Sequence, residues 1–148
     1  MIPLRLPPAT FRIKNTEKGQ SIFDPIRKKF VHLTPEEWVR QHVVFMLLSR
    51  KRTPQNLMNI EKELNVAGTK KRYDILVYNK DGSIFLAVEC KAPKVKIDQN
   101  VFDQIARYNL ALDADYLMVT NGLSHYYCIM DYEHKSYNFI EELPDYQL

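Results

Sequence analysis

Two stretches decide the fold of this chain: KRYDILVY at residues 71–78 and IFLAVECK at residues 84–91. Both are rich in β-branched and aromatic residues, which is typical of strands. The Asp81-Gly82 dipeptide between them favours a two-residue type I′ turn. The sequence therefore predicts an antiparallel hairpin with strands at Arg72–Tyr78 and Ser83–Cys90.

Counting along this hairpin brings two acids together. If Asp81-Gly82 is the two-residue loop, Asp74 lies directly opposite Glu89, and side chains opposed in this way have Cβ atoms about 4.5–5.5 Å apart. Lys91 lies two residues beyond Glu89 and therefore projects from the same face of the sheet. A one-residue bulge in either strand would shift the pairing, so the register is a hypothesis.

This pair of acids has a chemical interpretation. Two carboxylates about 5 Å apart repel by roughly 3 kcal/mol at an effective dielectric constant near 20. A divalent cation such as Mg²⁺ turns that repulsion into ligation, lowers the pKa of a bound water and polarises a phosphoryl oxygen. Lys91 would add a positive charge beside the reacting phosphate. The alternative is a solvated strand face, on which an acid followed by Glu-x-Lys is common by chance.

The rest of the chain indicates an α/β or α+β domain with a mixed sheet. Thr34 and Asp98 are good N-caps for two amphipathic helices that end near Arg50 and Leu112. The remaining strands are predicted at residues 56–64, 116–120, 126–130 and 137–140. Residues 1–30 are expected to form an irregular segment that packs on a domain of residues 31–148, with a short hairpin around residues 22–31 as a weaker alternative.

Length and composition exclude several classes of protein. The chain has 148 residues, a formal charge of +3 and only two cysteines, so one domain is expected, without a disulfide framework. The apolar runs are much shorter than the roughly 18 residues that a membrane span needs, so no membrane partner is expected. A reducing cytoplasm is the expected compartment. The mild basic charge is compatible with nucleic acid.

Beyond these patterns, the chain resembles a known family. Asp74 followed by Glu89-Cys90-Lys91 resembles the PD-(D/E)XK motif of restriction-endonuclease-like nucleases. Three further strings make the likeness more specific: VECKAP at residues 88–93, FDQIARY at 102–108 and TNG at 120–122. Together they are similar to the N-terminal nuclease domain of type I restriction enzyme R subunits and its small stand-alone relatives. The resemblance implies a restriction-endonuclease-like α/β fold, a mixed central β-sheet flanked by helices.

The same resemblance implies roles for individual residues. Asp74 and Glu89 would bind Mg²⁺, for which Mn²⁺ can substitute, and Lys91 would be the catalytic lysine. Gln104 and Tyr108 match a Gln-x-x-x-Tyr element and share one face of the second helix as substrate-binding candidates, although Tyr108 also fits the apolar stripe of that helix.

Three further residues are candidates for the site. Many members of the superfamily use an acid on the first helix, where Glu37 is the candidate, although a capping box explains Glu37 equally well. Glu61 on the preceding strand competes for that role. Arg72 belongs to the basic cluster of residues 70–72, which is a candidate contact for the phosphate backbone or a solvated face.

The expected activity is metal-dependent hydrolysis of DNA phosphodiester bonds. The rival from another class is a non-catalytic nucleic-acid-binding or assembly module that keeps the nuclease fold. A third reading is a nuclease that needs a motor or specificity subunit in trans, and a homodimer is compatible with all three. The chain contains no phosphate-binding P-loop motif, so ATP-driven translocation is not expected of it.

Overall fold

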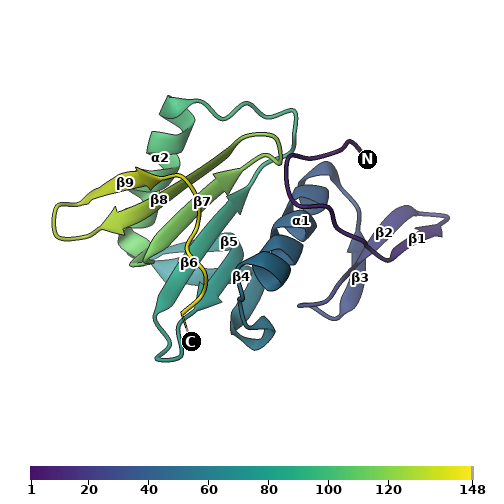
Figure 1. The fold of residues 1–148 in the computed structure, drawn as a ribbon, viewed down its shortest axis with the longest axis horizontal. Helices are drawn as coiled ribbons and strands as arrows, with labels where there is room; N and C mark the ends of the chain where they lie inside the picture. Colours follow the sequence, from purple (N-terminus) through teal and green to yellow (C-terminus); the bar gives the residue numbers. More distant parts are fainter. Residues whose placement is uncertain (148) are drawn as a thin grey trace.

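A computed structural model describes residues 1–147 and places two sheets around one long helix (Figure 1). The predicted hairpin becomes the centre of a six-stranded sheet with the order β4-β5-β6-β7-β8-β9. Its strands are β4 (Met58–Val66), β5 (Thr69–Tyr78), β6 (Ile84–Cys90), β7 (Tyr116–Thr120), β8 (His125–Asp131) and β9 (Ser136–Ile140). Only β6 and β7 run parallel, so the sheet is mixed, as expected.

One helix covers each face of this sheet (Figure 1). Helix α1 (Pro35–Arg50) buries Val39 and Val43 against the face that carries Ile75 and Val88. Helix α2 (Gln99–Asn109) packs Phe102 on the other face and continues into a short 3₁₀ helix at Leu110–Leu112. The three layers confirm the predicted α/β architecture with a mixed central sheet flanked by helices.

The predicted helix starts are confirmed in atomic detail. The Thr34 hydroxyl accepts a hydrogen bond of 3.0 Å from the Glu37 N–H, and the Asp98 carboxylate accepts one of 2.9 Å from the Val101 N–H. Each cap satisfies a backbone donor that has no partner inside its helix. A short 3₁₀ helix at Gln55–Leu57 precedes β4. Within residues 1–147, no helix is long and apolar enough to cross a lipid bilayer.

The N-terminal region differs from the prediction. Residues 13–32 form a three-stranded antiparallel sheet of β1 (Ile13–Thr16), β2 (Gly19–Asp24) and β3 (Lys29–His32), not an irregular segment. The weaker alternative, a hairpin around residues 22–31, is confirmed as the β2–β3 pair. Three prolines and the polar run Lys14–Gln20 favour loop in this segment, but Pro3, Pro7 and Pro8 all precede β1, and the polar run forms the exposed β1–β2 hairpin. The division of the chain at residue 31 stays a prediction.

The N-terminal sheet lies beside α1, on the side away from the six-stranded sheet (Figure 1). Before it, the chain crosses the domain, where the Arg5 N–H donates to the Gly122 carbonyl over 2.8 Å. Gly122 has a φ of +85°, and a Cβ atom at this position would lie 2.8 Å from Leu4 Cδ2. Glycine is therefore favoured here by the backbone angle, and any side chain would also have to displace the Leu4 side chain.

Candidate active site

Asp74 lies on β5, and its carboxylate connects three elements. Oδ2 accepts a hydrogen bond of 2.8 Å from the Cys90 N–H on β6, and Oδ1 accepts one of 2.7 Å from Arg40 Nη2 on α1. The paired residues of the hairpin end at Ile75 and Val88, so the next step of the register brings Asp74 level with Glu89. The backbone register agrees with the predicted alignment, but a shared face for the two acids stays a prediction, because the Asp74 carboxylate bonds Arg40 on the α1 side.

The turn of this hairpin is not the predicted one. The ladder closes at Tyr78 and Ile84, which leaves the five-residue loop 79–83, and the register shifts at Val77/Tyr78. A bulge in β6 offsets the longer loop: Phe85 and Leu86, although consecutive, both pack on the α1 side of the sheet. The prediction of a two-residue loop was wrong, yet the alignment at the acids is the same.

A second irregularity lies at Asp74 itself. Tyr73 packs on the α2 side of the sheet, whereas Ile75, two residues later, packs on the α1 side. Residues two apart on a regular strand share a face, so the alternation reverses at Asp74. Glu61 lies opposite Asp74 on β4 and has a φ of +53°, a value that residues of a regular strand do not adopt. This reversal lets the Asp74 carboxylate reach Arg40 on α1.

Glu89 lies on the α2 side of the sheet beside Lys71 of β5. Lys71 Nζ is 2.9 Å from Glu89 Oε1, but that oxygen is buried and accepts no hydrogen bond within residues 1–147. Burial raises the pKa of Glu89, and the negative charge of Asp74 acts in the same direction, whereas Lys71 and Lys91 oppose the shift. Glu89 is therefore a largely buried carboxylate that is ion-paired to Lys71 and lies next to a second acid.

A hollow of about 310 Å³ opens at Glu89, and we call it the Glu89 hollow. Gln104 and Tyr108 of α2 both contribute to it, and the Tyr108 side chain is 48% exposed and not part of the core. Lys71 Nζ lies 3.9 Å from the centre of the Tyr108 ring. The hollow is lined by Lys71, Glu89, Lys91, Gln104, Ile105 and Tyr108.

On the α1 side, Glu37 is part of a buried ion network. Its Oε1 accepts hydrogen bonds of 2.7 Å from Arg27 and 2.6 Å from Arg40, and its Oε2 accepts one of 3.1 Å from Gln41. Arg40 bonds Glu37 through Nη1 and Asp74 through Nη2, so its guanidinium lies between the two acids. These contacts assign Glu37 a structural position, separated from Asp74 by a cation.

Glu36 is the acid of α1 that interacts with Asp74. Its side chain is 48% exposed, and Arg40 Nη2 lies 3.5 Å from its Oε1. Partial burial raises the pKa of Glu36, and the charge of Asp74 adds to the shift, so the two carboxylates are close enough to interact. The sequence interpretation chose the neighbouring residue, Glu37, as the acid that the family resemblance implies on the first helix, with a capping box as the alternative explanation. The spacing of Glu36 and Arg40, four residues apart on one helix, was the available signal.

A second hollow of about 600 Å³ opens beside Glu36, and we call it the Glu36 hollow. The alternative acid Glu61 lines it and lies 3.4 Å from both Arg27 and Arg40. The other walls come from β3, the start of α1 and the segment after β6. Its lining comprises Arg27, Val31, His32, Thr34, Pro35, Glu36, Glu37, Arg40, Glu61, Ala92 and Lys94.

The structure separates Arg72 from these residues. Arg72 is exposed, pairs with Glu63 over 3.8 Å and lines neither hollow, whereas its neighbour Lys71 lines the Glu89 hollow. The interpretation of the basic cluster missed this because successive residues of a strand point to opposite faces. Lys71 and Tyr73 are two residues apart on β5 and therefore share a face, so this spacing would have indicated Lys71 as the residue on the α2 side. Cys90, between Glu89 and Lys91, is buried in the α1-side core, and burial raises the pKa of its thiol.

The fit of a metal ion rests on the chemistry of these donors. In residues 1–147, no three His, Cys, Asp or Glu side chains are grouped closely enough to form a ready metal centre. Asp74 and Glu89 nevertheless offer the hard carboxylate oxygens that Mg²⁺ prefers, and Glu89 Oε1 lacks a hydrogen bond. The two acids therefore fit a divalent cation, with Arg40 and Lys71 as their counter-charges in this state.

The family comparison agrees with this arrangement. The family model described as type I restriction enzyme R protein N terminus matches residues 35–144. The chain belongs to this family. The match covers α1, the whole six-stranded sheet and α2, and so includes Glu36, Asp74, Glu89 and Lys91. The curated proteins include no significant match. Membership in the R-protein N-terminal family supports a nuclease-like role linked to restriction-modification, and it implies interaction with DNA.

Proposed function

We propose that this R-protein N-terminal domain is a metal-dependent nuclease that hydrolyses phosphodiester bonds of DNA. The observation that carries the proposal is the position of Asp74 within β5 next to Glu89 near the end of β6, with Lys91 two residues after Glu89. A strand pair has no structural need for two neighbouring acids, one of them largely buried. Membership in the R-protein N-terminal family supports the same function.

In this proposal Asp74 and Glu89 hold Mg²⁺, and Mn²⁺ can substitute. The ion supplies polarisation of the phosphate and a lower pKa for a bound water. Glu36 contributes a third carboxylate beside Asp74. Arg40 is ion-paired to Asp74 and Lys71 is ion-paired to Glu89. These pairs would hold both carboxylates in position and offset part of their negative charge in the absence of a metal ion.

The residues of the Glu89 hollow have roles in binding the substrate. The Lys91 backbone is fixed by a hydrogen bond of 2.8 Å from its N–H to the Thr120 carbonyl, so its ammonium projects from a rigid strand end. That ammonium would neutralise charge on the phosphate oxygens. Gln104 and Tyr108 line the same hollow and would contact the nucleotide next to the cleaved bond. A motor or specificity subunit in trans, or a second copy of the chain, would supply sequence recognition.

One observation favours a second candidate, a DNA-binding module without turnover. Arg40 and Lys71 already form ion pairs with Asp74 and Glu89, and a site that never binds metal would keep such pairs permanently. The two candidates make different demands on divalent cations. A nuclease requires the cation for cleavage, whereas a binding module binds DNA equally well in a chelator.

The test is cleavage of plasmid DNA and single-stranded DNA with Mg²⁺ or Mn²⁺. Wild type is compared with Asp74→Ala and Lys91→Ala, and Lys135→Ala is the matched control because Lys135 is an exposed lysine in the β8–β9 turn. We expect metal-dependent nicking in wild type and control, and none in the other two variants. Cleavage that survives in both variants would overturn the assignment of the site, and its absence in wild type would favour the binding module.

A further inference from the structure

The positive charge of the chain is concentrated at its N-terminus. Residues 1–32 contain seven lysines and arginines against two acids, a formal charge of +5. Residues 33–148 contain fourteen against sixteen, a formal charge of −2. The excess of positive charge therefore coincides with the β1–β3 sheet, which lies outside the residues matched by the family.

Most of these cations are available for a partner. Of the charged residues in this sheet and its turns, Arg27 and Asp24 pair with each other over 2.5 Å. Within residues 1–147, none of the remaining cations is ion-paired to a carboxylate, in contrast to Arg40, Lys51 and Lys71 of the domain. We call these exposed cations the N-terminal basic face: Arg12, Lys14, Lys18, Lys28 and Lys29.

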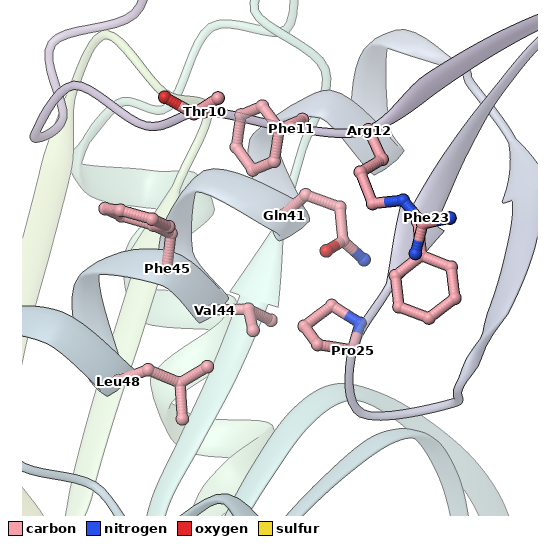
Figure 2. A pocket seen from close by; sticks show the side chains of 9 residues that line it. All are labelled: Thr10, Phe11, Arg12, Phe23, Pro25, Gln41, Val44, Phe45 and Leu48. Atoms are coloured by element: carbon pink, nitrogen blue, oxygen red, sulfur yellow. The ribbon is translucent and has the colours of Figure 1, made fainter.

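Aromatic rings hold two of the cations in place. The Arg12 guanidinium lies 4.7 Å from the centre of the Phe23 ring and 5.5 Å from that of Phe30, and Lys14 Nζ lies 5.3 Å from the Phe30 centre. Figure 2 shows Arg12 above Phe23 at the edge of an apolar pocket of about 180 Å³ between β2 and α1. Cations ordered by rings lose less conformational entropy when they bind an anion than free side chains do.

The sheet also borders the candidate active site. Val31 and His32 of β3 line the Glu36 hollow together with Glu36, Arg40 and Lys94. Arg27, in the β2–β3 turn, bonds Glu37 of α1 and lies 3.4 Å from Glu61 of β4. The N-terminal sheet is thus tied to the domain next to Asp74, and a polyanion bound on it would continue toward the hollow.

We propose that the N-terminal basic face binds the phosphate backbone of duplex DNA and guides it to the candidate active site. The partner follows from charge complementarity, because the cations are exposed, unpaired with acids within residues 1–147, and gathered on β1, β3 and the segments next to these strands. A six-residue strand such as β2 spans about 20 Å, which corresponds to roughly six phosphates along one DNA strand. The contacts are to backbone alone, so binding is independent of base sequence. This inference rests on the proposed function for its substrate, but not on cleavage.

The test is duplex binding as a function of salt in a chelator, which prevents cleavage. Fluorescence anisotropy of a labelled 20-base-pair duplex is measured for the triple variant Arg12→Gln, Lys14→Gln, Lys29→Gln. The control variant is Arg50→Gln, Lys80→Gln, Lys135→Gln, which removes the same charge from exposed positions elsewhere. Each lost phosphate contact reduces the steepness of log affinity against log salt by about 0.9. For the N-terminal variant we therefore expect the steepness to decrease by about 2–3 and the affinity for the duplex to fall about tenfold or more.

The control variant should keep the slope of wild type, and circular dichroism should show that both variants fold. An unchanged slope in the N-terminal variant would overturn the proposal and leave an acidic protein as the alternative partner of this face. Loss of binding to single-stranded DNA alone would also overturn it. If binding is lost as expected but wild type does not cleave DNA with Mg²⁺, the N-terminal basic face is retained and the nuclease assignment fails.

Discussion

Arg40 on α1 donates a hydrogen bond of 2.7 Å to Asp74 on β5, and both side chains are largely buried. Burial alone would lower the pKa of the guanidinium, but the bonds to Asp74 and Glu37 raise it above its usual value. Arg40 is therefore permanently charged and joins the first helix to the candidate metal-binding acid. The Nε atom of Arg40 has no hydrogen-bond partner within residues 1–147. The cost of burying the guanidinium is therefore offset mainly by the bonds that its Nη atoms make to these acids.

Replacement of Arg40 by methionine should strongly destabilise the protein. The variant leaves Asp74 and Glu37 buried without their shared cation, and breaking such a pair typically costs about 3–5 kcal/mol. Urea unfolding measures the change in the free energy of unfolding. Arg50→Ala is the control, since Arg50 is exposed at the end of the same helix and should change stability by less than about 0.5 kcal/mol. A loss below about 1 kcal/mol for Arg40→Met would contradict this role.

Glu89 should make stability depend on pH. Its pKa is raised in the folded protein, chiefly by burial, so the folded state binds its proton more tightly than the unfolded state does. Stability from this group is present below the ordinary glutamate pKa and is lost as the pH rises through the raised value. Glu89→Gln should remove this part of the pH dependence and be at least as stable as wild type at pH 7. Thermal unfolding between pH 4 and pH 8 checks both points, and a variant with the same pH profile as wild type would count against the shift.

Glu36 and Glu37 should separate activity from stability. Glu37→Gln weakens a buried network of two guanidinium groups, so we expect a loss of about 2–4 kcal/mol in unfolding free energy. Glu36→Gln changes a half-exposed side chain and should leave stability within about 0.5 kcal/mol of wild type. If Glu36 assists Asp74, its variant lowers metal-dependent cleavage about tenfold or more. Wild-type activity in Glu36→Gln would instead leave Glu61 as the acid to examine.

Tyr108 should act in the Glu89 hollow and not in the core. Its ring is half exposed and lies beneath Lys71 Nζ, so Tyr108→Ala should change unfolding free energy by less than about 1 kcal/mol. The same variant should reduce DNA cleavage, because Lys71 loses the surface that positions it beside Glu89. Tyr108→Phe keeps the ring and should retain most activity, and Arg107→Ala tests an exposed neighbour. Strong destabilisation by Tyr108→Ala would favour the core interpretation.

Local patterns in the sequence predicted most of the secondary structure correctly. Thr34 and Asp98 predict helix starts because their side chains satisfy backbone donors a few residues away. Runs rich in β-branched and aromatic residues predict the strands of the large sheet, and the central strands are buried in continuous runs because a helix covers each face. The N-terminal sheet was largely missed, because its β1 has no buried residue: all four of its residues are exposed.

The candidate site shows where such patterns end. Counting brought Asp74 level with Glu89 along the backbone, and the register keeps this spacing although the loop is longer than predicted, because a bulge in β6 offsets it. The structure places Lys71 beside Glu89 and Glu36 beside Arg40, whereas the sequence interpretation named their neighbours Arg72 and Glu37. Sequence position alone does not say which of two adjacent charged residues faces a site. The reversal of the alternation at Asp74 also changes which residues of β5 point to the α2 side.

The sequence by itself determined the α/β class and the hairpin, and it put forward Asp74, Glu89 and Lys91 as candidates, because spacing along a strand translates directly into position. Only the tertiary structure decided that Arg40 and Lys71 neutralise the two acids, that Glu36 lies beside Asp74, and that a basic sheet borders the site. These contacts join residues that are distant in the chain, and they depend on how helices and sheets pack, which no local pattern encodes.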